Sequence, residues 1–488
     1  MPELTVLVFL PIAAAVLILL LPKSYEQQSK WIALAASVAI LALSVQMFFG
    51  FELHHSGYQF VERHKWVDVG QFNLQYFLGV DGLSMPLVVL TTCLTLASVL
   101  VSFSVTNRPR AYYACLMVLA SSVLGVFVAL DFLLFFLFWE LELFPMFLLI
   151  AVWGSGRKEY SATKFVLYTI AGSAFMLVGI LVLAFNANTF DIEVLGKTEF
   201  HGTLIPLGWV FFLLFVGFAV KLPIVPLHTW LPDAHGDAPT AVSVMLAGVL
   251  LKMGGYGLIR MCITMMPGVA EDWDIWLAGI GAVSVLYGAC ITLRQTDVKR
   301  LVAYSSVSHM GLVLLGIGAL GNTGLVGATY QMLAHGLITG LMFVMIGLMY
   351  ERTHTREISR LGGLARQMPL ITTGLVFAGF GSLGLPALAG FIAEVTVFLG
   401  AFQRFEWAVL MSIFGVVLSA GYVLWMLQRV VFGPVKHEWD GVTDQHHWWE
   451  HTVVVGLVAL VILLGVYPKM MTDMIGPAID NIVVRVES

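Results

Sequence analysis

Ionisable side chains in the middle of long apolar runs are the residues of this sequence that could do chemistry. Lys221 lies in FVGFAVKLPIVP, Lys252 in LAGVLLKMGGYG, Glu140 in FLFWELELFP and Glu394 in GFIAEVTVF. An ionised side chain at the centre of a bilayer costs about 3 kcal/mol or more, so such residues usually pair with one another or line an ion path. Burial disfavours the charged form of lysine and a nearby carboxylate favours it, so a moving proton can switch the lysine between its two states. The pattern therefore favours proton movement over the alternative, a static ion pair that holds helices together.

Glu142 and two histidines extend this set. Glu142 points about 200° round a regular helix from Glu140, so the two carboxylates are not expected to share one site, and the role of Glu142 stays open. His309 in YSSVSHMGL and His335 in QMLAHGLIT lie in glycine-rich apolar runs. One such histidine could be a packing residue. Two of them beside further ionisable groups favour a relay, because imidazole titrates nearest to neutral pH.

The sequence contains no pattern that predicts a metal or a cofactor. His228 and His235 in PLHTWLPDAHG are seven residues apart, whereas a metal site needs three or four converging ligands. The four cysteines are widely spaced in apolar runs without a CxxC pair, which argues against an iron–sulfur cluster and a disulfide framework. No glycine-rich nucleotide motif follows a strand and precedes a helix. We therefore expect no redox centre, metal or cofactor in this chain.

The composition indicates that membrane helices position these residues. Of 488 residues, 59% are hydrophobic and 11% are charged, whereas a soluble domain has about 25% charged residues. Lipid must therefore be the solvent of this chain. A net charge of −5 gives no basic surface for nucleic acid. The N-terminal run lacks a basic segment and a cleavage site, so we expect a retained first span and one membrane domain over residues 1–488.

A membrane span needs roughly 20 apolar residues, and on that rule the sequence predicts an all-α polytopic membrane protein with about fourteen transmembrane helices. The expected spans are approximately 4–21, 30–50, 82–103, 111–130, 132–152, 163–186, 207–231, 239–261, 275–293, 299–320, 325–350, 369–402, 407–432 and 451–472. Loops after odd-numbered spans contain sixteen Lys and Arg residues, and loops after even-numbered spans contain five, Arg260 among them. This asymmetry predicts cytoplasmic odd loops and both termini on the non-cytoplasmic side. Lys221 and Lys252 are then the only Lys and Arg residues expected in the middle of a span.

Leu-Pro dipeptides interrupt the seventh and twelfth spans, at Leu222-Pro223 and Leu385-Pro386. Proline breaks a helix, and broken backbone in a membrane is tolerated only where protein or a water-filled cavity satisfies it. Interruptions in corresponding positions indicate an inverted repeat with the ion site at its interface. We predict two inverted five-helix repeats, helices 4–8 over residues 111–261 and helices 9–13 over 275–432. Peripheral helices 1–3 occupy residues 1–110, and the last helix and tail occupy 451–488.

The run FAVKLPIVPLHTWLPDAHGDAPTAVSVMLAGVLLKMGGYGLIR (218–260) resembles the signature of the antiporter-like subunits of respiratory complex I. WELELFPMFLLIAVWG (139–154), KRLVAYSSVSHMG (299–311) and ALAGFIAEVTVF (387–398) resemble the same family, so the likeness covers essentially the whole chain. Glutamate at position 394, where sister subunits and Mrp-type antiporters usually carry lysine, resembles the M-type chain, counterpart of the fourth mitochondrially encoded subunit. The M-type chain also resembles this sequence in ending after the last span, without the long lateral-helix extension of the L-type subunit. WELELFP, LLKMGGYGLIRM and YERTHT look most like cyanobacterial and plastid versions, from which HGDAPTAVS departs.

The resemblance implies a role for each of six residues that buried charge alone also selects. Glu140 would be the carboxylate and Lys221 the lysine of a first half-channel. Lys252 would be the central lysine, and His309 and His335 the bridging relay groups. Glu394 would be the terminal exchange site toward the outer side.

The resemblance also implies a function and its setting. The chain would be a proton-translocating subunit of an NADH, NAD(P)H or ferredoxin:quinone oxidoreductase. NAD(P)H or ferredoxin, iron–sulfur clusters and quinone (plastoquinone in thylakoids) would bind elsewhere in the complex. Its partners would be L-type and N-type antiporter-like chains and the lipid of a bacterial inner membrane or a cyanobacterial or plastid thylakoid. The alternative is a subunit of an Mrp-type sodium/proton antiporter.

Overall fold

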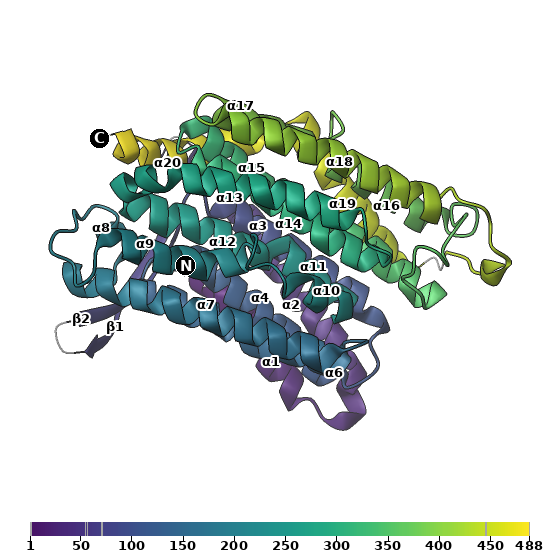
Figure 1. The fold of residues 1–488 in the computed structure, drawn as a ribbon. Helices are drawn as coiled ribbons and strands as arrows, with labels where there is room; N and C mark the ends of the chain where they lie inside the picture. The colour runs from purple at the N-terminus through teal and green to yellow at the C-terminus, as the bar shows by residue number, and fades with distance from the viewer. Residues whose placement is uncertain (1, 54, 56, 70–71, 445–446, 488) are drawn as a thin grey trace.

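The computed structural model describes residues 2–53, 55, 57–69, 72–444 and 447–487, and it is a bundle of helices with one β hairpin (Figure 1). The helices are α1 (Glu3–Leu20), α2 (Ser29–Phe49), α3 (Met85–Val101), α4 (Pro109–Val128), α5 (Phe132–Leu141), α6 (Leu143–Trp153), α7 (Lys158–Ala187), α8 (Ile192–Leu195), α9 (Leu207–Lys221), α10 (Leu231–Asp237), α11 (Thr240–Met245), α12 (Leu251–Gly257), α13 (Pro267–Thr292), α14 (Val298–Gly318), α15 (Asn322–Thr353), α16 (Pro369–Ser382), α17 (Ala389–Phe402), α18 (Glu406–Val430), α19 (Trp448–Val466) and α20 (Lys469–Glu487). Two π-helical segments, η3 (Leu246–Leu250) and η4 (Leu258–Ile263), flank α12. The strands are β1 (Gln59–Val69) and β2 (Phe72–Val80).

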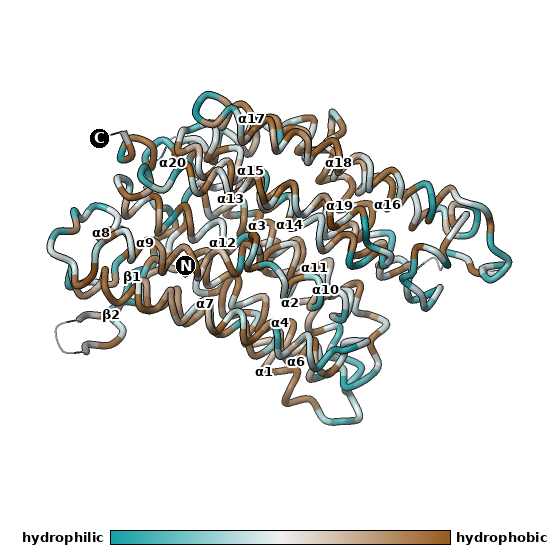
Figure 2. The backbone as a smooth tube through the Cα atoms, in the orientation of Figure 1, coloured by the Kyte–Doolittle hydropathy of each residue, from teal (hydrophilic) through white to brown (hydrophobic). Residues whose placement is uncertain are grey.

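Twelve helices in the described part of the chain are long and apolar enough to cross a membrane. One of them consists of α5 and α6, and another runs through α11, η3, α12 and η4. Apolar residues follow the helices, and polar residues gather in the connections at the two ends of the bundle (Figure 2). The chain therefore has the architecture of a polytopic helical membrane protein, as its composition predicts.

Three shorter apolar helices, α9, α16 and α17, border the two interruptions that the sequence predicts. Pro223 has no N–H for the carbonyl of Ala219, which accepts a hydrogen bond from the Ile224 backbone N–H at 3.3 Å instead. The indole N–H of Trp230 donates to the carbonyl of Val220 at 2.9 Å. Protein donors thus satisfy the backbone carbonyls of Ala219 and Val220 at the break after α9, as burial in a membrane requires.

The predicted number of fourteen spans is compatible with this arrangement. Twelve long helices and two interrupted segments, α9 with α10 and α16 with α17, would together make fourteen crossings. Length and composition alone do not place a membrane, so the number, the inverted repeats and the division at residues 110, 261 and 432 remain predictions.

The hairpin and the C-terminal helix were not predicted. β1 and β2 pair antiparallel in the segment between the second and third expected spans. The alternation in Phe72-Asn-Leu-Gln-Tyr76 is the sequence signal that could have found a strand there. α20 buries Met474, Ile475 and Ile479 along one face. It is an amphipathic helix rather than an irregular tail.

The two ends of the bundle differ in the elements that they carry. The hairpin, α8 and α20 lie at one end, drawn on the left of Figure 1, which we call the hairpin end. The Leu4 backbone N–H donates to Glu62 of β1 at 2.8 Å, and Arg485 donates to the carbonyl of Gly196, so both terminal segments are fixed at this end. We call the opposite end, with the loops 154–157, 293–297 and 354–368, the basic end.

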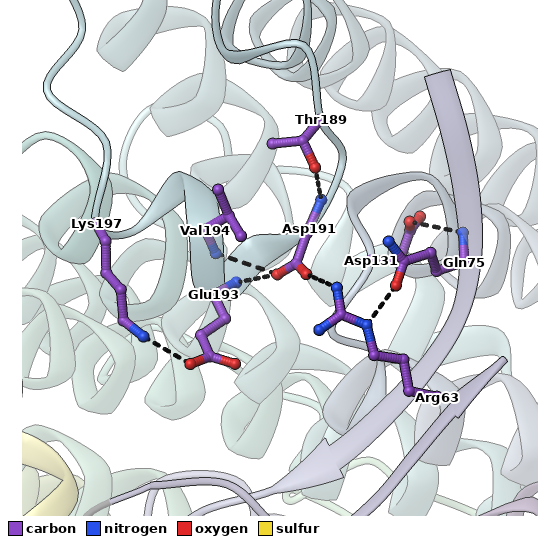
Figure 3. A network of polar contacts seen from close by, with 8 residues as sticks. All are labelled: Arg63, Gln75, Asp131, Thr189, Asp191, Glu193, Val194 and Lys197. Atoms are coloured by element: carbon purple, nitrogen blue, oxygen red, sulfur yellow. Dashed lines mark hydrogen bonds and ion pairs between the residues drawn. The ribbon is translucent and has the colours of Figure 1, made fainter. Parts of the chain in front are cut away.

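Two aspartates connect the hairpin to the turns between helices (Figure 3). Asp131 caps α5 by accepting hydrogen bonds from the backbone N–H groups of Leu133 and Leu134, and it also accepts one from Gln75 of β2. Asp191 caps α8 in the same way and forms an ion pair of 2.6 Å with Arg63 of β1. N-terminal capping satisfies backbone donors that a helix leaves unpaired. The hairpin end is therefore held by caps that serve two elements at once.

The pKa of the Asp131 carboxyl gives a test of this network. Burial raises that pKa from 3.8 to about 6, although the backbone hydrogen bonds from Leu134, Gln75 and Leu133 oppose the shift. Between pH 4 and pH 6 the folded protein holds a proton that the unfolded chain releases, so stability falls as pH rises through this window. Asp131→Asn keeps the capping oxygen and removes the titration. We expect the stability of Asp131→Asn relative to wild type to rise by about 2 kcal/mol between pH 4 and pH 7, measured by denaturant unfolding in detergent. A difference that does not change with pH would contradict the assignment.

Candidate functional site

The helix that carries the first pair of glutamates is interrupted at Glu142. α5 ends at Leu141 and α6 begins at Leu143. Pro145 has no N–H for the carbonyl of Leu141, so the regular helical bonding fails at this turn. Glu142 itself keeps right-handed helical φ and ψ angles of −69° and −25°, so the interruption is the loss of one hydrogen bond in a nearly continuous helix.

Lys221 forms its direct ion pair with Glu142. The Lys221 side chain is 1% exposed and that of Glu142 is 0% exposed, and the lysine Nζ contacts the carboxylate Oε1. Nζ also lies 5.4 Å from the ring centroids of Trp139 and Phe165, a distance at which a cation is attracted to an aromatic face. Lys221 is the last residue of α9, so the helix break leaves its side chain free to reach α5 and α6.

This contact corrects the predicted partner of Lys221. The sequence argument, and the resemblance, assigned Glu140 to that position. Glu140 acts on Lys221 electrostatically but makes no direct ion pair with it among the described residues, and its Oε1 has no protein hydrogen-bond partner there. The two carboxylates therefore face the same lysine, one in contact and one at longer range.

Lys252 has a different environment from Lys221. It lies in α12, between two π-helical segments, and is 0% exposed. Its Nζ donates to the backbone carbonyl of Ala247 and to His335 Nδ1, at 2.7 Å from the latter. Ala247 lies in the π-helical segment η3, and such segments are frequent at functional sites. No carboxylate of the described chain lies within 4 Å of this ammonium group, which is held by neutral acceptors.

His335 belongs to a cluster that extends to Glu394. The rings of His335 and His309 have centroids 5.5 Å apart. His309 Nδ1 lies 3.7 Å from Glu394 Oε1, and His309 Nε2 lies 3.1 Å from the hydroxyl of Ser382. Lys252, His335, His309 and Glu394 thus follow one another through a hydrogen bond, a ring-to-ring contact and an approach of 3.7 Å between imidazole and carboxylate.

A small cavity adjoins this cluster. It has a volume of about 10 Å³ and is lined by His309, His335, Thr339, Ser382 and Glu394, among others. That volume is close to the minimum that holds one water molecule, and its polar lining offers the two to four partners that a buried water needs. A water molecule in this cavity could therefore form hydrogen bonds that join the histidines to the Glu394 carboxylate.

The break between α16 and α17 positions the Glu394 carboxylate. Pro386 has no N–H for the carbonyl of Ser382, where α16 ends. Gly384 in the break has φ +72°, and a Cβ at this residue would lie 2.6 Å from Glu394 Oε2. Glycine is required there for the backbone conformation and for the close approach of the carboxylate.

The six predicted residues fall into two groups. Lys221 and Glu140, with Glu142, form the first, and Lys252, His335, His309 and Glu394 form the second. The two groups meet where α12 packs on α9: a Cβ on Gly254 would lie 2.6 Å from the backbone of Phe218 and Leu222. The lysines are therefore on adjacent helices, while the continuous hydrated axis between them remains a prediction.

Two participants were missed and one residue was misplaced by the sequence analysis. Gln331 Nε2 lies 3.4 Å from His309 Nδ1, and Ser382 contacts the same ring; neither carries the charge that the search relied on. Arg260, expected in a loop, is a buried residue of η4 and forms an ion pair of 2.6 Å with buried Asp81. Arg260 therefore belongs to the last turns of a helix and not to a loop, and it lies just inside the predicted span 239–261.

The described residues contain no group of three or more His, Cys, Asp and Glu side chains that could hold a metal ion. His228 and His235 lie in and beside α10 and are both buried. The groups that are present can accept, hold and release protons. A series of lysine, imidazole and carboxylate at hydrogen-bond or near hydrogen-bond distances is suited to proton transfer.

The family model described as NADH:quinone oxidoreductase/Mrp antiporter, TM, matches residues 129–419. NADH-quinone oxidoreductase subunit M of Rhodobacter capsulatus is 42% identical over 98% of this chain and 96% of its own length. NAD(P)H-quinone oxidoreductase chain 4 1 of Nostoc sp. is also 42% identical, over 97% of this chain and 89% of its own. The identity to these two proteins is equal, so it does not favour the cyanobacterial branch.

Solved structures agree with the sequence relatives. A chain of respiratory complex I from Thermus thermophilus superimposes with a TM-score of 0.88 and 27% identity, over 98% of this chain and 99% of that one. A chain of the Mrp complex from Dietzia sp. has a TM-score of 0.86 and 18% identity, over 100% and 98%. The latter likeness shows a shared fold.

The assignment of Glu142 as the direct partner of Lys221 predicts unequal coupling of the two glutamates. Breaking a buried ion pair by removing one partner costs about 3–5 kcal/mol, because an unpaired charge stays buried. We expect Glu142→Gln to destabilise the protein by that order and Lys221→Met in the same chain to restore most of the loss. In thermal unfolding, a double-mutant cycle of Glu140→Gln with Lys221→Met should show weaker coupling. Stronger coupling to Glu140 than to Glu142 would contradict the contact.

Proposed function

Since the chain belongs to the transmembrane family of NADH:quinone oxidoreductase and Mrp antiporter subunits, we propose that Lys221, Lys252 and Glu394 carry protons through it. The chain is an M-type, antiporter-like subunit of a complex I-type quinone oxidoreductase, and thus part of a translocase. The observation that carries the proposed path is the series of contacts from Lys252 through His335 and His309 to Glu394.

Each link of this series has a physical role in the proposal. Lys252 holds its proton against neutral acceptors, so a charge that arrives nearby shifts the proton to His335 Nδ1 without breaking an ion pair. The histidines pass it on, because imidazole accepts a proton on one nitrogen while it releases one from the other. Glu394, beside the broken backbone between α16 and α17, exchanges it with the outer side.

Lys221 and its two glutamates form the first half-channel of the proposal. The contact with Glu142 stabilises the charged lysine, and Glu140 can strengthen or weaken that state according to its own protonation. A change in this pair alters the field at Lys252 on the adjacent helix. Glu142 thus joins the six residues named from the sequence.

The wider setting is part of the same proposal. Quinone reduction elsewhere in the complex drives the path, and NAD(P)H or ferredoxin, iron–sulfur clusters and quinone bind in other subunits. L-type and N-type chains are its neighbours. The basic end faces the cytoplasm or its equivalent, which places both termini on the opposite side. The Mrp-type alternative is supported by a common fold, whereas the full-length relatives at 42% identity are quinone oxidoreductase subunits by name.

Glu394 separates a proton path from a static charge. Glu394→Asp keeps a titrating group and shortens it by one methylene, and Glu394→Ala removes it. We expect Asp to retain substantial proton pumping and Ala to lose most of it, with the complex assembled in both cases, measured as quinone-driven proton uptake by membrane vesicles. Glu406→Ala, at an exposed carboxylate where α18 begins, is the control and should pump normally. Normal pumping by assembled Glu394→Ala would remove this residue from the path.

A further inference from the structure

His235 is a buried ionisable group that the proposed path does not use. It lies in α10, is 0% exposed, and stacks on Phe343 of α15 with ring centroids 4.6 Å apart. Neither of its ring nitrogens has a hydrogen-bond partner among the described protein atoms. A buried imidazole without protein partners requires another explanation, and water is the usual one.

A cavity with charged side chains in its lining adjoins the segment that carries His235, at the basic end of the bundle. Its volume is about 100 Å³, room for several water molecules, and Asp237, Ala238, Thr240, Lys299 and Gly347 contribute to its lining. The buried Lys299 ammonium group donates to the carbonyl of Ala238, three residues after His235. The cavity therefore reaches the helix that holds the histidine.

The face of α15 connects this cavity to the relay. Gly347 lines the cavity, Phe343 stacks on His235, Thr339 lines the small cavity beside Glu394, and His335 contacts Lys252. These four residues are spaced by four, so they follow one another along one helix face, and about 12 Å of helix rise separates Phe343 from His335. His235 thus lies between the cavity and the relay.

The groups around His235 are the ones that a proton would have to pass. Lys299 of α14, Lys252 of α12 and His335 of α15 all lie within electrostatic range of His235. His335 Nε2 also lacks a protein partner among the described residues, while its Nδ1 is occupied by Lys252. Both histidines therefore have a buried ring nitrogen without a protein partner.

We propose that His235 is the uptake relay of this subunit, which passes protons from the water of the basic-end cavity to His335 and Lys252. This rests on the proposed function and adds to it the side and the residue by which protons arrive. Neutral His235 takes a proton from cavity water on one ring nitrogen and releases the proton of the other nitrogen to water that leads to His335. His335 Nε2 accepts this proton once Lys252 is neutral and His335 carries its own proton on Nδ1, and the Nδ1 proton then passes to Lys252. The His235 ring ends neutral with its two nitrogens exchanged, so charge and atoms balance.

The test uses the assembled complex in inverted membrane vesicles, whose medium faces the basic end. His235→Ala should lower quinone-driven proton uptake at least about tenfold, and imidazole in the medium should restore a large part of it. Free imidazole replaces the lost relay, whereas it would not repair a packing defect. His228→Ala is the matched control: a buried histidine of the same broken segment that contacts the rings of Tyr287 and Tyr304. It should pump normally and show no response to imidazole.

Two results would overturn the inference: wild-type uptake by assembled His235→Ala, or a loss that imidazole does not restore. If His235→Ala fails to assemble, His235→Gln fills the ring space without titrating, and wild-type uptake by that variant overturns the inference while lost uptake supports it. Lys252→Met, measured beside these variants, separates the two proposals. Normal uptake by Lys252→Met contradicts the proton path itself, whereas normal uptake by His235→Ala alone contradicts only the uptake relay.

Discussion

The energy of a charge in hydrocarbon is the constraint on which the rest of this structure depends. A lysine or glutamate at mid-membrane must be paired, neutral or hydrated. In this chain the helices break where the charged groups lie: at Glu142 between α5 and α6, after Lys221 in α9, and before Glu394 between α16 and α17. Each break frees a side chain to leave its own helix face and meet a partner on another helix. The prolines and glycines in these segments therefore help to bring the charged side chains to their partners.

The two lysines meet the same constraint in two ways. Lys221 is in direct contact with a carboxylate, so its charged form is stabilised by a full opposite charge. Lys252 has a backbone carbonyl and an imidazole as its acceptors, so its charged and neutral forms are closer in free energy. The two lysines therefore differ in how readily they release a proton: Lys221 keeps its charge in the ion pair, whereas Lys252 can pass its proton to His335. A uniform row of ion pairs would bind protons without passing them on.

Much of the site could be predicted because buried charge is rare in such an apolar chain. Lys221, Lys252 and Glu394 stand out from hydropathy alone, and the resemblance and the full-length relatives agree on the family. The direct contact of Lys221 is with Glu142 and not with Glu140, because two glutamates two positions apart in one apolar run cannot be told apart by buried charge. Arg260 was assigned to a loop although it lies just inside the predicted span 239–261, and η4 continues the helix to Ile263. The hairpin was missed because its strands of 11 and 9 residues lie between two much stronger apolar runs. Neutral partners such as Gln331 and Ser382 were missed because they carry no charge.

The central claim is that Lys252 must change its charge for protons to cross, and Lys252→Arg tests it most directly. Arginine keeps the positive charge and the ability to donate to Ala247 and His335, but its guanidinium does not release a proton in proteins. The measurement is quinone-driven proton uptake by vesicles, normalised to the amount of assembled complex. The account predicts that Lys252→Arg assembles and loses most of its proton uptake. Uptake at the wild-type rate would show that a fixed positive charge is sufficient at this position and would contradict the account.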